Sequence, residues 1–401
     1  MKKSIKRTLL LAIGASMLSY ADELGDILST NKSMIFDYQM QTNELESDKL
    51  SKSWINPTNL RYSKTYSTQY NGGETKDSAN FTVSIDQPIF RSGGIYYAIK
   101  YSQALRKANR AEITLQKRMM ITDAVTILFN IHKNRLLQKK MKYQIKNDKI
   151  DIRQKRDSYN AGLLDSSFLD QAILKKSQDE TSLLELELAL STLEQQFMLL
   201  SDKKPDTLQL PALKLVTEEA YKTANLELQR DRLRALEEEH NQKITWAKYL
   251  PTVSLQGTYI DGENASPVMT AYEEEYYNYG FSVSMPLDIN GFDDIEASKV
   301  AKLQAATEAI EREKAVDQEY QWIVNNLDIL DRKISLAKKD VNVYQSLYRV
   351  TKNLADAGEK TTMDAQVMLN TLKIRKLDQK IYHIDKQIEL LKLYARMENV
   401  L

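Results

Sequence analysis

The chain has 401 residues, and its 56 Lys and Arg nearly balance its 55 Asp and Glu, which leaves a formal net charge of +1. This balance gives no electrostatic reason to expect nucleic-acid binding. Apolar residues make up 42% of the chain against 28% charged residues, and only 12 Gly and 7 Pro interrupt it. Such a composition favours long helices over one large round core.

The first 21 residues predict a cleaved secretory signal peptide. Basic residues lie between positions 2 and 7, an apolar run follows over 9–18, and the small residues Ser19 and Ala21 come next. The alternative is a membrane anchor, but the run is about half as long as a bilayer-spanning helix needs. We therefore expect an exported protein, in which the lack of Cys excludes disulfides and a lipoprotein anchor.

The rest of the sequence contains two copies of one plan. FTVSIDQPIF from Phe81 has a counterpart in FSVSMPLDI from Phe281, and YNAGLLDSSFLDQA from Tyr159 pairs with LADAGEKTTMDAQ from Leu354. The order of these segments is the same in both halves, which indicates an internal duplication. We expect a first repeat over 22–204, an equatorial junction over 205–216 and a second repeat over 217–401.

Each repeat predicts short helices, two strands and one very long helix. In the first repeat we expect helices at about 33–54, 95–157 and 166–200, and strands at about 58–70 and 81–89. In the second repeat we expect helices at about 224–248, 293–356 and 361–400, and strands at about 252–260 and 277–286. The long helices have about 60 residues and a length of about 90 Å, which two short helices placed end to end would match.

The four predicted strands alternate between apolar and polar residues, and their apolar side is rich in Tyr. This pattern is typical of a membrane barrel with lipid outside and water inside, although Lys64 interrupts the apolar side and is tolerable only near an interface. Four strands cannot close a barrel, and lipid does not tolerate open sheet edges. Copies of the chain must therefore combine, and three copies would supply about twelve strands. The sequence alone also allows two or four copies.

No active site, cofactor site or metal site is predicted. The three His residues each stand alone on a charged helix, where we expect exposed side chains, and there is no Cys. The RSGG segment at Arg91 lacks the Lys that follows a phosphate-binding loop, so it is better explained as a turn from strand to helix. The acidic run from Glu273 to Glu275 is best explained as a solvated loop, with cation attraction at a pore mouth as the alternative.

Two tryptophans occupy equivalent positions in the two halves. Trp54 and Trp246 each stand just before the Pro-Thr pair that precedes a strand. They are either anchors at a membrane interface or packing residues between a helix end and the sheet.

Taken together, these segments resemble the TolC-like outer membrane efflux protein family. The motifs that carry the resemblance are VSIDQPIFRSGG, LPTVSLQG, and the paired segments YNAGLLDSSFLDQA and DAGEKTTMDAQ. The resemblance implies a mostly α protein with a small β part. It also implies a homotrimer in which four strands per chain form a twelve-stranded transmembrane β-barrel, continued by a twelve-helix periplasmic α-barrel.

The resemblance further implies an outer membrane location and no enzymatic activity. The protein would be the exit duct of a tripartite efflux pump or type I secretion system. Its partners would be a periplasmic adaptor and an inner-membrane transporter of the RND, ABC or MFS type. The alternative is a periplasmic coiled-coil adaptor or scaffold without a pore, which would not need four Tyr-rich strands.

The family's functional positions map onto the two helical turns. Those that contact the adaptor match Ala161, Gly162, Leu163, Ala357, Gly358 and Glu359. The family's aspartate ring at the pore entrance matches Asp364, and Lys360 stands at a basic gate position. Asp364 is equally explained as a helix-capping carboxylate. The chain departs from the family at Phe168, Ala355 and Val367, where Asp, Tyr and a second Asp are usual.

Overall fold

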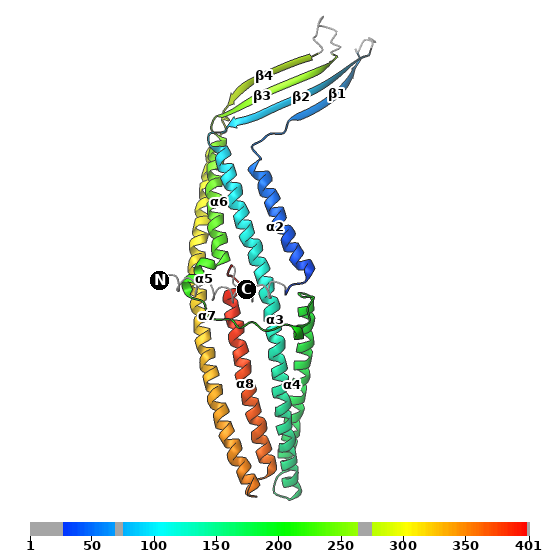
Figure 1. Cartoon of the computed structure of the whole chain (residues 1–401), viewed down its shortest axis with the longest axis vertical. Helices are drawn as coiled ribbons and strands as arrows, with labels where there is room; N and C mark the ends of the chain where they lie inside the picture. The colour runs from blue at the N-terminus through cyan, green and yellow to red at the C-terminus, as the bar shows by residue number, and fades with distance from the viewer. Residues whose placement is uncertain (1–26, 69–74, 264–274, 399–401) are drawn as a thin grey trace, which may run out of the picture. The chain divides into compact units, whose positions relative to one another are not determined.

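The computed structural model describes residues 27–68, 75–263 and 275–398. The expected signal peptide over 1–21 lies outside these residues, as do Tyr70, Glu273, Glu274 and Val400. The described chain is mostly helical and contains a four-stranded antiparallel sheet, as the sequence predicted (Figure 1). None of the described helices has the length and hydrophobicity of a transmembrane helix.

The first half of the chain contains α2 (Thr30–Ser51), β1 (Asn59–Ser67), β2 (Lys76–Phe90), α3 (Gly94–Asn160), α4 (Ser166–Met198) and the short 3-10 helix η1 (Pro205–Thr207). The second half contains α5 (Glu218–Ala224), α6 (Leu226–Lys248), β3 (Thr252–Glu263), β4 (Glu275–Ser284), α7 (Gly291–Asp356) and α8 (Thr362–Tyr394). The sequence did not indicate α5 as a separate helix. It begins at a local signal, the Thr217 hydroxyl, which accepts a hydrogen bond from the Ala220 N–H.

The chain divides into two compact units, and each unit takes segments from both halves of the sequence. Unit 1 comprises Met1–Asp37, Ile113–Leu226 and Glu313–Leu401, and unit 2 comprises Tyr38–Glu112 and Glu227–Arg312. The sheet belongs to unit 2, and the helix-to-helix turns that follow α3 and α7 belong to unit 1.

The sheet of unit 2 has the strand order β1-β2-β3-β4, and its register places the apolar side chains on one face. One row of the pairing joins Tyr62 to Phe81, and another joins Leu255 to Phe281. Many side chains of this face are exposed, including Tyr62 at 68% and Tyr279 at 86%. The alternating residues on the other face are mostly Ser, Thr, Asn and Gln. One face of the sheet is thus apolar but uncovered within the chain.

Lys64, a charged residue on this apolar face, has a partner on the neighbouring strand. Its Nζ atom lies 3.2 Å from an Asp77 carboxylate oxygen. The pair lies between the row that joins Tyr62 to Phe81 and the C-terminal end of β1. The charge is therefore compensated at the margin of the apolar face.

The Gly pair at the start of α3 turns the chain from the sheet into the helix. Gly93 has a φ of 86°, a left-handed conformation that glycine adopts without strain, and the Gly94 N–H donates to the Arg91 carbonyl at 2.7 Å. A Cβ atom on Gly94 would lie 3.2 Å from the Ala247 Cβ, so α3 approaches α6 closely here. Pro88 is accommodated in the central strand β2 because a register shift lies between it and Phe90.

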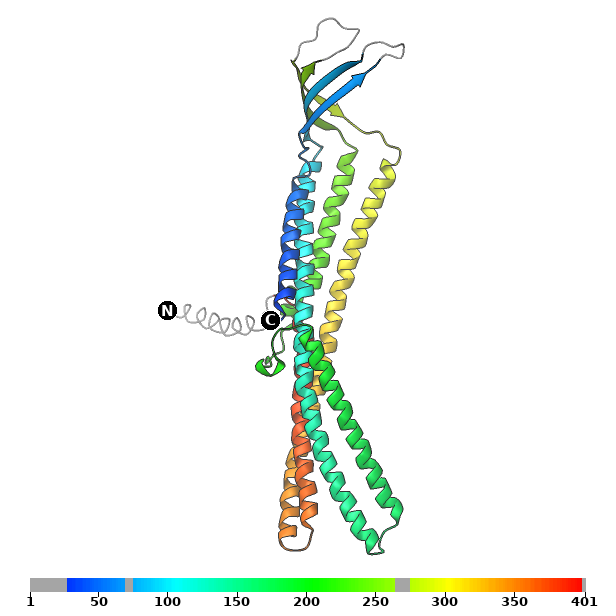
Figure 2. The ribbon, with the colours of Figure 1, turned by 90° about the vertical axis from the view of Figure 1, so that its right-hand side faces the viewer.

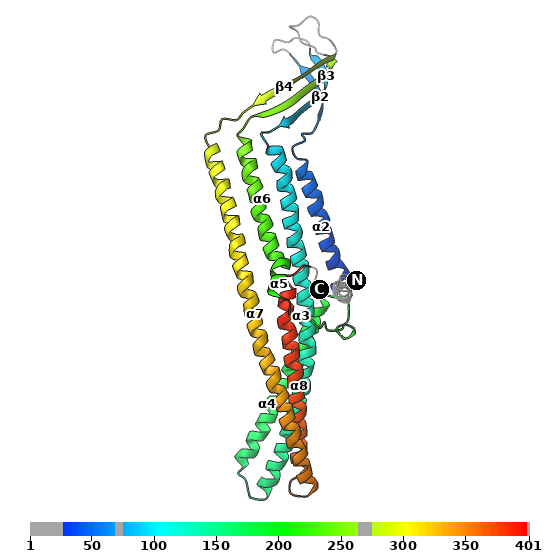
Figure 3. The same cartoon turned by 60° about the vertical axis from the view of Figure 1, so that its left-hand side comes forward.

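The helices of unit 2 lie side by side in the order α2, α3, α6, α7 (Figure 3). The Asn43 amide of α2 donates to the Arg106 carbonyl of α3 at 3.0 Å. Alanines occupy much of the buried surface, including Ala104, Ala108 and Ala247. Small residues allow close packing but bury little apolar area, so polar contacts have a larger role in this unit.

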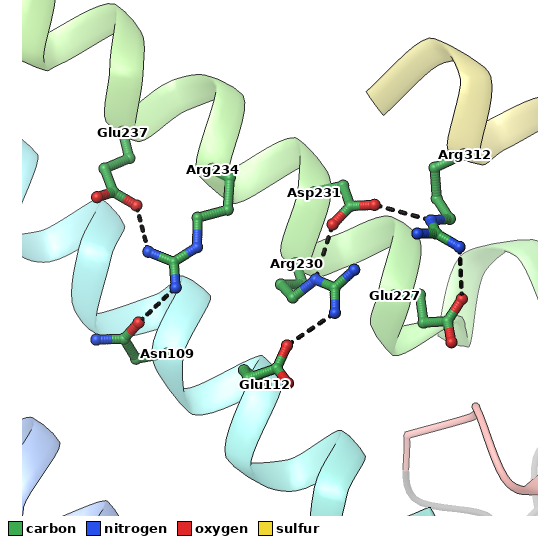
Figure 4. Close-up of polar contacts among 8 residues, drawn as sticks. All are labelled: Asn109, Glu112, Glu227, Arg230, Asp231, Arg234, Glu237 and Arg312. Atoms are coloured by element: carbon green, nitrogen blue, oxygen red, sulfur yellow. Dashed lines mark hydrogen bonds and ion pairs between the residues drawn. The ribbon is translucent and has the colours of Figure 1, made fainter. Parts of the chain in front are cut away.

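Arginines of α6 and α7 form a polar network that joins three helices (Figure 4). Arg230 bonds Asp231 at 2.7 Å and Glu112 of α3 at 2.8 Å. Arg312 of α7 bonds Asp231 at 2.8 Å and Glu227 at 3.0 Å. The Asp231 carboxylate thus accepts bonds from both arginines, with its side chain only 16% exposed. A nearby contact joins Arg234 to Asn109 of α3 at 2.8 Å.

The helices of unit 1 follow the order α4, α3, α8, α7. Arg135 of α3 bonds Glu194 of α4 at 3.0 Å. Lys140 of α3 bonds Asp378 of α8 at 2.7 Å, and Asn326 of α7 donates to Glu389 of α8 at 2.9 Å. Helices α4 and α7 therefore stand at the two ends of the row.

Unit 1 contains most of the apolar core. Among the largest fully buried side chains, all but Leu228 belong to this unit. The set is Tyr221, Phe129, Phe197, Ile27, Leu128, Ile131, Leu226, Ile323, Leu391, Leu393 and Val125. The segment after α4 and the helix α5 are bonded to α7, because the Tyr320 hydroxyl donates to the Val216 carbonyl at 2.8 Å and the Tyr221 hydroxyl donates to Glu319 at 3.0 Å.

Replacing Asp231 tests the role of the polar network. Asp231→Asn removes the charge that both arginines face, and we expect the free energy of unfolding to fall by about 2 kcal/mol. The measurement is the midpoint of thermal unfolding by circular dichroism in detergent. Glu46→Gln on the exposed surface of α2 is the matched control and should leave the midpoint unchanged. An unchanged midpoint in Asp231→Asn as well would show that the network does not stabilise unit 2.

Candidate functional site

The turn between α3 and α4 has the hydrogen bonds of a Schellman motif. The Leu163 N–H donates to the Ser158 carbonyl at 2.9 Å, and the Gly162 N–H donates to the Tyr159 carbonyl at 2.9 Å. Gly162 has a φ of 71°, as this motif requires. The Leu163 side chain is 79% exposed at the turn.

The turn between α7 and α8 has the same geometry. The Glu359 N–H donates to the Leu354 carbonyl at 2.9 Å, and the Gly358 N–H donates to the Ala355 carbonyl at 3.1 Å. Gly358 has a φ of 81°, and nothing lies within 4 Å of the position that a Cβ atom would take at either turn glycine. Backbone conformation, not space, is therefore the reason for glycine at both turns.

Both turns lie at the same end of unit 1 (Figure 2), and the candidate adaptor-contact residues are exposed there. Each turn leads into a helix that begins with a side-chain cap. Asp165 accepts a hydrogen bond from the Ser167 N–H at 2.8 Å, and this bond lowers the pKa of Asp165. Thr361 caps α8 in the same position relative to its glycine.

The structure places Asp364 in a capping box at the start of α8. Its Oδ2 atom accepts hydrogen bonds from the Thr361 hydroxyl at 2.8 Å and from the Thr361 N–H at 3.1 Å. Its Oδ1 atom accepts a bond from the Gln154 amide of α3 at 3.0 Å. The bonds from Thr361 and Gln154, together with the Lys360 charge, lower the pKa of Asp364.

Both carboxylate oxygens of Asp364 are thus engaged within the chain, and the capping interpretation of this residue holds. Its contact with Gln154 also ties α3 to α8 near the turns. No sequence rule could have found this contact, because the two residues are 210 positions apart. Lys360 is exposed and lies next to the cap.

The two tryptophans differ in exposure. Trp246 in the last turn of α6 is 55% exposed, whereas Trp54 after α2 is half-buried. The chain around Trp54 is held by Gln87 of β2, whose amide donates to the Trp54 carbonyl at 3.1 Å and accepts from the Asn56 N–H at 3.0 Å. Both residues lie between the helices and the sheet of unit 2, so either an anchoring or a packing role fits their position.

The expectation of exposed histidines was wrong for two of the three. His383 is exposed, but His132 and His240 are half-buried, and burial lowers the pKa of both. Sequence analysis could not tell which helix faces would be covered. Within the described residues no group of three or more His, Asp or Glu side chains is arranged to hold a metal ion.

Comparison with solved structures identifies the fold. The outer membrane protein VceC of Vibrio cholerae matches with a TM-score of 0.74 and 14% identity, over 95% of this chain and 97% of that one. The outer membrane channel CmeC of Campylobacter jejuni matches with a TM-score of 0.73 and 15% identity, over 96% and 87%. The open state of the MtrE outer membrane channel of Neisseria gonorrhoeae matches with a TM-score of 0.63 and 12% identity, over 94% and 88%.

This chain has the fold of these outer membrane proteins. The likeness extends over nearly its whole length, and it confirms the mostly helical chain with a small antiparallel sheet that the resemblance to TolC-like proteins implied. The sequence itself matches no family model and no curated protein.

Replacing Asp364 tests its capping role. Asp364→Asn removes the ionised acceptor of the capping box, and we expect the first turn of α8 to lose about 1 kcal/mol of local stability. Because the pKa of Asp364 is lowered, its contribution is present above the ordinary Asp pKa and is lost as the pH falls through the lowered value. Hydrogen exchange of peptides covering 361–368 measures this change. Glu359→Gln, an exposed change in the same turn, is the control, and equal exchange in both variants would contradict the capping role.

Proposed function

We propose that this protein is an outer membrane channel, the exit duct of a tripartite efflux pump or of a type I secretion system. The observation that carries the proposal is the structural match to outer membrane channels along almost the entire chain. In this proposal the sheet spans the outer membrane, and the helices extend into the periplasm.

The sheet supports a pore built from several copies. It has two terminal strands, β1 and β4, and each presents an outer edge that no described strand pairs. Lipid cannot satisfy the backbone N–H and C=O groups of such edges, so each must pair with a neighbouring copy. The exposed, Tyr-rich face suits the lipid side of a barrel. Three copies would give twelve strands, enough to leave an open lumen.

The helices of unit 1 support the same assembly. The end helices of the row, α4 and α7, carry apolar side chains that the described residues leave exposed. On α4 these include Leu174 at 60% and Leu188 at 70% exposure, and on α7 they include Leu336 at 61% and Val350 at 55%. Covering these faces by packing α4 of one copy against α7 of the next would continue the row into a closed α-barrel of twelve helices. The order of helices within one copy thus predicts which faces meet.

The two turns are the proposed contact with a periplasmic adaptor. Their exposed residues Ala161, Gly162, Leu163, Ala357, Gly358 and Glu359 stand at one end of unit 1. An inner-membrane transporter of the RND, ABC or MFS type would deliver the cargo. Asp364 and Lys360 lie just beyond the second turn, so a ring of Asp364 carboxylates, one per copy, would attract cations at the entrance.

Engineered disulfides between the sheet edges test the trimer. The chain has no Cys, so introduced pairs react without interference. We expect Ser63→Cys on β1, combined in turn with Asn278→Cys, Ser282→Cys and Ser284→Cys on β4, to link chains into a ladder that ends at a trimer. The readout is gel electrophoresis of oxidised membranes under non-reducing conditions.

The matched control combines Ser63→Cys with Ser254→Cys on the central strand β3. This strand is paired on both sides within the chain, so we expect no linkage between copies. If none of the β4 pairs links chains, or if the ladder ends at a dimer, the trimeric barrel is wrong.

Channel recordings test the gate. In planar bilayers Asp364→Asn should lower the preference for cations, because the amide removes one negative charge per copy from the entrance. Lys360→Gln should raise the preference for cations, because it removes one positive charge per copy. If Asp364→Asn leaves both conductance and cation preference unchanged, Asp364 is only a helix cap.

A further inference from the structure

The α3–α4 hairpin of unit 1 contains a cluster of charged side chains between its two helices. Asp148 of α3 is only 3% exposed. Its Oδ1 atom accepts a hydrogen bond from the Lys175 ammonium of α4 at 2.8 Å and a longer one from the Gln144 amide at 3.4 Å. One oxygen of this buried carboxylate is therefore well satisfied.

A second carboxyl group lies beside Asp148. The Asp179 side chain of α4 lies within hydrogen-bonding reach of Asp148. The Oδ2 atoms of both residues are buried, and neither has a hydrogen-bond donor among the described residues. Ionised carboxylates only accept hydrogen bonds, so two of them in contact need a proton between them.

The position of Asp179 on α4 explains why it meets Asp148. Lys175 and Asp179 are four residues apart, one helical turn, so both point toward α3. With both carboxyl groups ionised, the cluster would contain two negative charges and one positive charge, although the positive Lys175 side chain is 55% exposed and Asp179 is half-buried. Asp151 of α3, which acts electrostatically on Lys175, adds a further negative charge.

We propose that Asp179 holds a proton against the Asp148 carboxylate, and that this proton fastens α4 to α3 in the hairpin. With the proton in place, Asp179 donates to the Asp148 Oδ2 atom while Lys175 neutralises Asp148. Loss of the proton leaves two carboxylates facing each other, and their repulsion pushes the helices apart. The hairpin therefore senses the pH of the compartment in which it stands.

The direction of this response follows from the cluster. Burial and the neighbouring Asp148 raise the pKa of Asp179 above its ordinary value of 3.8. A group with a raised pKa contributes stability that is complete below the ordinary value and is lost as the pH rises through the raised one. Acidic conditions thus tighten the hairpin, in contrast to their effect on the caps at Asp165 and Asp364. The inference concerns the hairpin itself and does not depend on the proposed function.

Hydrogen exchange of α4 in the full-length protein in detergent tests the role of the Asp179 proton. The key variant is Asp179→Asn, whose amide donates to Asp148 at every pH. At each pH over roughly pH 4 to 9 the parent is compared with the variant, so that the intrinsic exchange rate cancels. We expect the ratio of parent to variant exchange to rise by up to about tenfold per pH unit between the ordinary and the raised pKa, and then to level off.

The control is Asp170→Asn, which changes an exposed carboxylate on the same helix and should behave like the parent at every pH. Asp148→Asn gives Asp179 a permanent donor and should remove the pH dependence in the same way, so the test remains if Asp179→Asn fails to fold. If the ratio of parent to variant exchange stays constant with pH for both Asp179→Asn and Asp148→Asn, the proposal is wrong.

Discussion

The unpaired edges of the sheet constrain the rest of the molecule. In the proposed channel the apolar, Tyr-rich face places the sheet in lipid, where each unsatisfied backbone group would cost several kcal/mol. Pairing β1 of one copy with β4 of the next would satisfy these groups. The same neighbour relation would then cover the exposed apolar faces of α4 and α7 in unit 1. One requirement of the backbone thus accounts for features of both units without a catalytic site.

The two units are stabilised in different ways. Unit 1 contains a buried apolar core around Phe129 and Leu391, where the segment that joins the sequence halves packs against the helices. Unit 2 has small residues between its helices and relies on arginine networks centred on Asp231. Moderate ionic strength screens half-buried ion pairs but has little effect on apolar burial. A rise in ionic strength should therefore affect the arginine network of unit 2 more than the apolar core of unit 1.

Much of the fold was predictable because its signals are local. Alternation in the strands predicted which side chains share a face, and Gly162 and Gly358 predicted the turns because the Schellman motif needs a left-handed residue. The Asp148–Asp179 pair, the Gln154–Asp364 contact and the burial of His132 and His240 were not predictable. They depend on how long helices rotate against one another, and a helix with several partly apolar faces does not specify that rotation.

The central claim is that the processed chain is a membrane-embedded assembly of identical copies. Its most direct test is the mass of the protein extracted from the outer membrane fraction, measured by light scattering during size-exclusion chromatography in detergent. The account predicts a single species with the protein mass of three chains, which requires detergent to stay in solution. A stable monomer that is released by osmotic shock and remains soluble without detergent would contradict it.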